Sequence, residues 1–189
     1  MGQAATRRYG YAEYLIVEHD TGTRHEYLDG QTWAMAGGTP RHSAIKSNLQ
    51  ALFRNALHGT PCRPYDSDLK IRVLKTGLAT YPDLAVLCGR LETHPEDPNA
   101  VTNPVLLGEV LSDDTEAWDR GGKFAHFRCI TSLRHYLLLP QDSERIESYT
   151  RQEDGSWRLT EHFSGDVVGL EALGVELHVD LVYQDLPST

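Results

Sequence analysis

The sequence predicts an α/β fold: a mixed β-sheet flanked by helices, with additional antiparallel hairpins. Three patterns indicate this fold. Apolar residues recur at helical spacing from Ser43, short apolar or alternating segments recur along the chain, and two Asp-Gly pairs mark tight hairpin turns. We therefore expect a sheet of about six to eight strands, with one helix beginning at Ser43 and another near Asp114.

The first half of the chain contains segments with helical spacing of apolar residues and segments with the two-residue alternation of a strand. Residues 11–18 (YAEYLIVE) suit a short helix or a strand, and RHEYLDGQTWAMA predicts a hairpin that turns at Asp29-Gly30. SDLKIRV alternates, which predicts a strand with one polar face, and YPDLAVLCG predicts a short apolar strand entered through Pro82. The helix expected between the hairpin and SDLKIRV carries apolar residues at Ile45, Leu49, Leu52, Phe53 and Ala56.

The second half predicts buried strands, one helix and a second hairpin. Residues 92–104, rich in Pro, Glu and Asp, indicate a loop, and PVLLGEVL and RHYLLLP indicate buried strands. A helix is expected from Asp114 or Thr115 to about Cys129. RIESYTR and SWRLTEHF alternate around the turn EDG, and the tail VDLVYQDL predicts a closing helix capped by Asp180.

Length and composition limit the class of protein. The 189 residues, 40% hydrophobic and 24% charged, predict one globular domain over residues 1–189. We expect no membrane span and no secretory signal, because the apolar runs are short and MGQAATRRYG precedes no apolar segment. The net charge of −9 argues against a protein that coats nucleic acid through its charge, but not against an enzyme that meets phosphates through a bound cation.

The cysteines point to a reducing compartment. Cys62, Cys88 and Cys129 are odd in number, widely spaced and without a CxxC pair. This pattern argues against a disulfide framework and against a thiolate metal site. We therefore expect a cytoplasmic location.

The candidate chemistry centres on Asp83 and Glu109. Asp83 opens one apolar strand, and Glu109 lies inside another. An ionised carboxylate removed from water is costly unless it is paired or bound to a cation, and two neighbouring carboxylates raise one pKa unless a metal ion or a lysine compensates. Paired carboxylates near a lysine are typical of Mg²⁺-assisted phosphoryl chemistry, in which hard oxygens hold the ion.

A purely structural interpretation of the two acids stays open. Glu109 could pair with Arg72 or Arg134, and a Pro-Asp pair before a strand is a common turn. Motifs for several other chemistries are missing, since the sequence contains no GxSxG, HExxH, GxxxxGK or GxGxxG.

Six segments, taken in order, carry a family resemblance: RHEYLDG, PRHSAI, SDLKIRV, YPDLAVL, GEVLS-x-x-T-x-x-x-D-x-x-x-K and LRHYLLL. With these spacings the chain resembles a large, mostly uncharacterised family of bacterial restriction-endonuclease-like proteins within the PD-(D/E)XK nuclease superfamily. The resemblance covers about Tyr14 to Leu186. It implies a restriction-endonuclease-like core.

The resemblance also implies roles for three residues. In the superfamily the first carboxylate opens a core strand, here Asp83, and the second lies on the neighbouring strand, here Glu109. The lysine normally follows two residues later, but that position is Leu111. The family's own pattern places a lysine on the following helix, where Lys123 matches it, so the amine is expected to reach the site from a helix.

The sequence around Lys123 is compatible with that role. Asp119 and Lys123 lie four residues apart, hence on one helical face, although a solvated surface ion pair is the alternative. Gly121 and Gly122 would each cost a helix roughly 1 kcal/mol relative to alanine. A kink or a close approach to the sheet or a ligand is therefore expected there.

Four further residues are candidates for the site. Glu26 matches a family glutamate and could be an extra metal or water ligand, or an exposed strand residue. His42 could touch a phosphate or the water, or make a local hydrogen bond at the helix start. Asp68 and Lys70 share the polar face of their strand, where they could border the cleft or face solvent.

We therefore expect a Mg²⁺-dependent endonuclease, with Mn²⁺ as a substitute, that hydrolyses phosphodiester bonds in nucleic acid, with DNA as the expected substrate. Asp83, Glu109 and the backbone carbonyl of Val110 would hold the metal, and Lys123 would position water or offset charge on the phosphate. Proteins of this resemblance often pair, so a homodimer is expected. The alternatives are a catalytically silent binding or interaction module, which the acidic charge and Leu111 favour, and a phosphodiesterase for smaller substrates.

Overall fold

The structure is a computed structural model that describes residues 8–35 and 37–187. The expectation about a secretory signal falls largely on residues 1–7, outside this range. The helical segments are α1 (Tyr11–Thr21), α2 (Pro40–Ala56), the π-helical segment η1 (Trp118–Lys123), α3 (Phe124–Phe127) and α4 (Val179–Tyr183). In the described part of the chain, no helix has both the length and the apolar character needed to cross a membrane.

The strands form two six-stranded sheets and a separate hairpin. The central sheet has the order β12-β11-β10-β9-β6-β3, the second sheet has the order β2-β1-β5-β4-β8-β7, and β13 pairs with β14. The strands are β1 (His25–Leu28), β2 (Gln31–Ala34), β3 (Cys62–Tyr65), β4 (Lys70–Arg72), β5 (Ala79–Thr80), β6 (Leu84–Cys88), β7 (Thr93–His94), β8 (Asp97–Val101), β9 (Leu106–Val110), β10 (His135–Leu139), β11 (Arg145–Arg151), β12 (Trp157–Phe163), β13 (Val167–Leu170) and β14 (Val175–His178).

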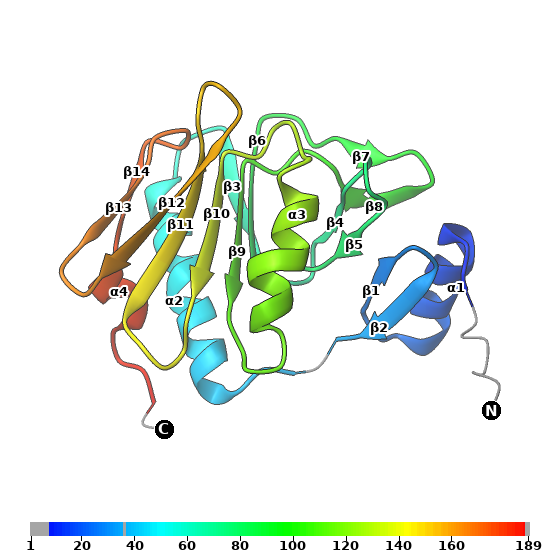
Figure 1. Ribbon diagram of the computed structural model, residues 1–189, viewed down its shortest axis with the longest axis horizontal. Coiled ribbons are helices and arrows are strands. Elements are labelled where there is room, and N and C mark those ends of the chain that lie inside the picture. The colour runs from blue at the N-terminus through cyan, green and yellow to red at the C-terminus, as the bar shows by residue number, and fades with distance from the viewer. Residues whose placement is uncertain (1–7, 36, 188–189) are drawn as a thin grey trace.

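The predicted mixed α/β architecture is confirmed. In the central sheet β9 and β10 run parallel, while the other neighbouring strands are antiparallel. Figure 1 shows α2 on one face of this sheet and α3 on the other, with α1 and the β1–β2 hairpin set to one side. The second sheet thus brings the N-terminal part of the chain next to the half of the central sheet that holds β9, β6 and β3.

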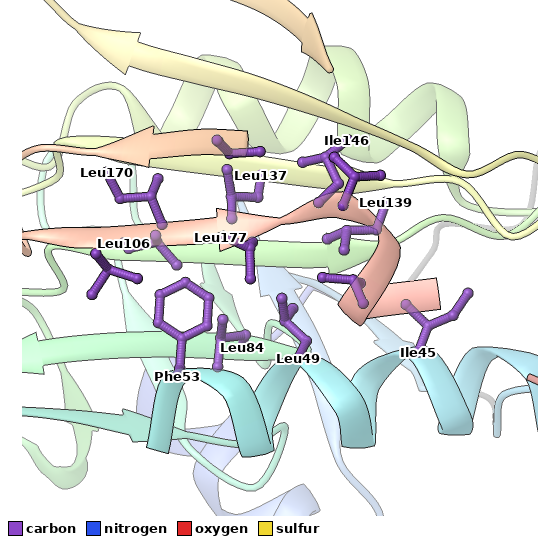
Figure 2. Packing of buried hydrophobic residues seen from close by; sticks show 14 of the residues in the cluster. Ile45, Leu49, Phe53, Leu84, Leu106, Leu137, Leu139, Ile146, Leu170 and Leu177 are labelled. Carbon is purple, nitrogen blue, oxygen red and sulfur yellow. The ribbon is translucent and has the colours of Figure 1, made fainter. Parts of the chain in front are cut away.

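Strand alternation divides the core into two clusters. Ile45, Leu49 and Phe53 of α2 are fully buried against one face of the central sheet, where Leu84 and Leu106 meet them (Figure 2). Burying each such side chain contributes about 1.5–3 kcal/mol. The opposite face carries a second cluster, formed with the helix after β9, that includes Leu107, Leu111, Phe127, Tyr136 and Leu138. Because residues two apart on a strand share a face, Glu109 faces this second cluster.

Helix α2 begins before the expected Ser43. Pro40 occupies its first turn, where a missing N–H costs nothing, and the Thr39 hydroxyl accepts the backbone N–H of His42 at 3.0 Å. This early start matters for the site, because it places His42 within the helix and its side chain beside β6.

Two local expectations are wrong, and one hairpin was not predicted. Residues 92–104 are not an open loop but contain β7 and β8, and the β13–β14 hairpin had no predicted counterpart. His178, not Asp180, stands at the cap of α4; the Asp180 carboxylate instead accepts the Ser164 hydroxyl and the Gly165 N–H. Each feature depends on pairing with distant or irregular backbone, which a local pattern does not report.

The expectation against a disulfide is also wrong. Cys62 on β3 and Cys88 on β6 lie opposite each other in the strand register and are joined by a disulfide. Cys129 is a free thiol. The two paired cysteines are 26 residues apart, so only the antiparallel register of β3 and β6 brings them together.

The polar face of β4 is internal rather than solvent-facing. The Lys70 ammonium lies 2.7 Å from a Glu18 carboxylate oxygen and 3.0 Å from Asp97. Arg72 is also buried, with its guanidinium 3.8 Å from the ring centroid of Tyr11. These contacts fasten α1 to the second sheet, so the alternation in SDLKIRV reflects an internal ion network.

Asp97→Asn tests this network through its pH dependence. Burial alone would raise the pKa of Asp97, but hydrogen bonds from Lys70 and Tyr11 outweigh it and hold the pKa below its ordinary value. The carboxylate's stabilisation is therefore present above about pH 4 and is lost as the pH falls through the lower folded-state pKa. We expect the variant to lose about 2 kcal/mol of unfolding free energy at neutral pH.

Urea unfolding of wild type and variant at neutral pH and at about pH 3 measures this difference. The difference should shrink at the lower pH. The exposed residue Asp113 supplies the control, since Asp113→Asn should change the unfolding free energy by less than about 0.5 kcal/mol. A difference of the same size at both pH values would contradict the assignment.

Candidate active site

Asp83 and Glu109 lie beside each other, one just before β6 and the other on β9. The register pairs Leu84 of β6 with Gly108 of β9. Asp83 directly precedes Leu84 and Glu109 directly follows Gly108, so the two acids are neighbours. The Asp83 N–H lies 3.3 Å from Glu109 Oε2. The two acids that the sequence singled out are therefore adjacent across the sheet.

Asp83 is held by groups from both sides. Its Oδ2 accepts the Val110 N–H at 2.9 Å and lies 3.1 Å from His42 Nε2, while Lys46 Nζ is 3.8 Å from Oδ1. Burial alone would raise the pKa of Asp83, but His42, the Val110 N–H and Lys46 outweigh it and lower the pKa below its ordinary value. Asp83 is thus an anion at neutral pH.

The backbone polar groups of Val110 point toward Asp83. The neighbouring Leu111 N–H donates to the Leu139 carbonyl of β10, so the N–H and carbonyl of Val110 point to the β6 side, where the N–H donates to Asp83 Oδ2. Pro82, which precedes Asp83, has no N–H to donate. The Val110 carbonyl therefore lies on the side of β9 from which Asp83 approaches.

Lys123 is a buried ammonium surrounded by three carboxylates. Its Nζ lies 2.9 Å from Glu26, 3.1 Å from Glu109 and 3.0 Å from Asp119. Burial alone would lower the pKa of Lys123, but the three anions outweigh it and raise the pKa well above its ordinary value. Lys123 therefore stays charged across the physiological range.

The acids around Lys123 are short of positive charge. Burial, the negative charges of Asp119 and Asp83 and only partial compensation by Lys123 raise the pKa of Glu109 well above its ordinary value. Burial likewise raises the pKa of Asp119. The cluster as a whole would gain from a further cation.

A π-helical turn aims Lys123 at the sheet. Segment η1 carries Asp119 and Lys123 on its buried side, and the wider π turn is a common device at functional sites. Glycine is required at position 122 for a steric reason, since a Cβ there would overlap the indole ring of Trp118. The indole lies back over the turn, and its N–H reaches Glu26 Oε2 at 3.2 Å. Gly121 faces open space.

The second sheet supplies the other wall of the site. Glu26 on β1 accepts the Thr80 hydroxyl at 2.6 Å, which fixes it beside Lys123. Tyr81 donates its hydroxyl to Glu18 of α1 at 2.8 Å. Because Tyr81 lies only two residues before Asp83, this bond connects α1 to the start of β6.

A cavity of about 780 Å³ opens over these groups. Its lining includes the almost fully buried side chains of Asp83, Glu109 and Lys123, here called the floor. It also includes residues of the β1–β2 hairpin and of the segment before η1, here called the walls. Further lining residues are Glu26, Leu28, Gln31, Trp33, Met35, His42, Tyr81, Val110, Ser112, Asp114, Thr115, Trp118, Asp119 and Gln141.

The structure brings most of the predicted site residues together but not all. Asp83, Glu109, Lys123, the Val110 backbone, Glu26, His42 and Asp119 meet at the cavity. Glu109 pairs with Lys123 rather than with Arg72 or Arg134, and the Asp119–Lys123 pair is buried rather than solvated.

Asp68 and Lys70 lie elsewhere. Asp68 is exposed and pairs with Arg24, and Lys70 belongs to the Glu18–Asp97 network. Sequence reasoning missed Lys46 and Trp118. Lys46 follows His42 by four residues on α2, a spacing that signals a shared face, whereas no local signal marks the contact between Trp118 and Glu26.

The donor set suits a hard cation. Two carboxylates and a backbone carbonyl are oxygen ligands of the kind that hard cations prefer. Among the described residues, no group of three or more His, Cys, Asp and Glu side chains is arranged to hold a metal ion. Mg²⁺ needs no such group, because it keeps several waters and takes one or two carboxylates.

Comparison with known proteins places the chain in a family. The Uma2 family model, described as "Putative restriction endonuclease", matches residues 11–181, a span that includes every residue of the site. The chain belongs to the Uma2 family. Two relatives from Synechocystis sp., both described as uncharacterized proteins, are slr1290, 40% identical over 92% of this chain and 90% of its own, and sll1609, 31% identical over 84% and 89%.

The Uma2 fold also has a solved counterpart. A crystal structure described as "a putative nuclease belonging to DUF820" from Anabaena variabilis superposes with a TM-score of 0.69. It covers 86% of this chain and 90% of its own, at 16% sequence identity. At that identity the likeness establishes a shared fold.

Gly122→Ala should disturb the site, and Gly121→Ala supplies a matched control one residue away. The new Cβ at position 122 overlaps the Trp118 indole, so the ring must move and lose its bond to Glu26. We expect a loss of about 1–3 kcal/mol of unfolding free energy, measured by urea unfolding, with a changed tryptophan emission. Gly121→Ala, which meets open space, should be neutral or stabilising by up to about 1 kcal/mol. Equal effects of the two substitutions would refute the steric explanation.

Proposed function

We propose that this protein is a Mg²⁺-dependent nuclease that hydrolyses phosphodiester bonds in nucleic acid, with DNA as its substrate. One arrangement carries the proposal: Asp83, at the start of β6, and Glu109 of β9 are neighbours, with the Lys123 ammonium 3.1 Å from Glu109, and all three line a cavity. Membership of the Uma2 family, described as "Putative restriction endonuclease", supports it.

In this proposal the chain's own residues divide the work. Asp83, Glu109 and the Val110 carbonyl hold the ion. When bound, Mg²⁺ supplies a Lewis acid that polarises a phosphoryl oxygen and acidifies a bound water. His42 and Lys46 keep Asp83 ionised and oriented, and Lys123 offers a charged donor for a phosphate oxygen or the attacking water.

Lys123 meets a constraint in this role. An ammonium has three N–H donors, and Glu26, Glu109 and Asp119 each lie within 3.1 Å of Nζ. A substrate oxygen would therefore compete with these carboxylates for the ammonium. Glu109 would release it most readily, because Glu109 would also hold the ion.

The same observation favours a second candidate function. A lysine surrounded by three carboxylates inside the protein can be a structural residue, and the chain is acidic, with a net charge of −9. In that case the protein is a module that keeps the nuclease fold and binds without cleaving. A phosphodiesterase for small substrates is a third outcome, distinguished below.

A cleavage assay with matched variants tests the proposal. Supercoiled plasmid and single-stranded circular DNA are incubated with Mg²⁺ or Mn²⁺ and wild type, Asp83→Asn or Lys123→Met. Loss of a metal ligand or of the charged donor should lower the cleavage rate by at least about 100-fold. Asp68→Asn is the control, since Asp68 is exposed and outside the cavity, and its rate should stay within about twofold.

The outcomes separate the candidates. Equal cleavage by all four proteins means a contaminating nuclease and removes the proposal. Folded protein that cleaves neither DNA supports the silent module, while hydrolysis of bis(p-nitrophenyl) phosphate alone supports the small-substrate enzyme. Circular dichroism accompanies Lys123→Met, because breaking a buried ion pair costs about 3–5 kcal/mol.

A further inference from the structure

One face of the β1–β2 hairpin turns toward the cavity and carries an exposed tryptophan. Trp33 lies opposite Glu26 in the antiparallel register, so the two side chains share a face. The same holds for Leu28 and Gln31, and all four residues line the cavity. Glu26 is the carboxylate that reaches Lys123, so Trp33 stands on the wall above the acidic floor.

The position of Trp33 sets it apart from other exposed apolar residues. Scattered apolar side chains on a surface are ordinary, and Phe163 on β12 is one example, 53% exposed and outside the cavity. Trp33 is 46% exposed on β2, the edge strand of the second sheet. An indole in that place offers a flat ring to whatever enters the cavity.

The depth of the floor limits what can reach the acids. The side chains of Glu109 and Lys123 are only 5% and 7% exposed, and that of Asp83 is 14% exposed. A cavity of about 780 Å³ has the size of a small-molecule site. The phosphates of an intact duplex lie on a stiff, wide cylinder, whereas an unpaired strand can bend one nucleotide into such a space.

The charge of the cavity also indicates how a nucleotide would be held. Glu26, Asp114 and Asp119 line it together with the two floor acids, against the single buried ammonium of Lys123. Attraction between basic side chains and phosphates therefore contributes little binding. Stacking of a base on an aromatic ring does not need such charges and tolerates any base.

We propose that the cavity takes an unpaired nucleotide of a single-stranded nucleic acid, with its base stacked on Trp33 and its phosphate next to the cation that Asp83 and Glu109 would hold. This inference rests on the proposed nuclease function, because it gives the substrate class of the same site. DNA and RNA strands share the required stacking chemistry, and separate arms of the test distinguish them.

Fluorescence anisotropy with labelled oligonucleotides tests the inference without cleavage. Single-stranded DNA, single-stranded RNA and a DNA duplex of one sequence, each of about 20 nucleotides, are titrated with the full chain in EDTA. Single strands should bind at least about tenfold more tightly than the duplex. Trp33→Ala should weaken single-strand binding at least about tenfold, the effect of losing one base stack, and Trp33→Phe should retain most of it.

Phe163→Ala is the matched control, because it removes an equally exposed aromatic ring outside the cavity. Its affinity should equal that of wild type. Duplex binding as tight as single-strand binding would overturn the inference, as would equal affinities for Trp33→Ala and Phe163→Ala.

The cleavage assay separates this inference from the proposed function. Single-strand cleavage that needs Asp83 but is unchanged in Trp33→Ala would overturn the inference and leave the nuclease intact. Single-strand binding that needs Trp33, without cleavage under Mg²⁺ or Mn²⁺, would support the inference and contradict the nuclease.

Discussion

The buried ammonium of Lys123 is the interaction on which the rest of the site depends. Its three carboxylate partners come from β1 of the second sheet, β9 of the central sheet and the π-helical turn that carries the lysine itself. Taken out of water, each carboxylate would be costly without the ammonium, and the ammonium would be costly without them. One charge therefore ties both sheets and the helix to the floor of the cavity.

Because of this arrangement, the positions of the site's acids depend on how the two sheets and the helices pack. Strand alternation sends Leu106 and Val110 to the α2 side and Glu109 to the opposite side, where the helix after β9 packs. Asp83 is fixed by α2 from one side and by the Val110 backbone from the other. The acids thus stand where the two sheets and two helices meet, and none of these elements can move without changing the site.

The sequence was sufficient for the two acids but not for their partners. Asp83 and Glu109 could be predicted because the first opens an apolar strand and the second interrupts one, and both are local and costly placements. Lys123 was reached only through a family pattern, because the distance from a helix to a sheet is not encoded in spacing. Lys70 was placed on a polar face that turned out to be internal, since alternation cannot tell solvent from a buried ion network. The Trp118–Gly122 overlap and the Cys62–Cys88 pair likewise depend on three-dimensional packing and strand register.

The ion pair between Glu26 and Lys123 joins residues that are far apart in the sequence, and this separation affects biosynthesis. Glu26 is synthesised before its partner Lys123, which lies 97 residues later in the chain. The ribosome therefore releases the N-terminal hairpin well before the charge that holds it exists, and closing so long a loop is entropically slow. A growing polypeptide carries dispersed acids and no assembled centre until roughly two-thirds of its length has been translated.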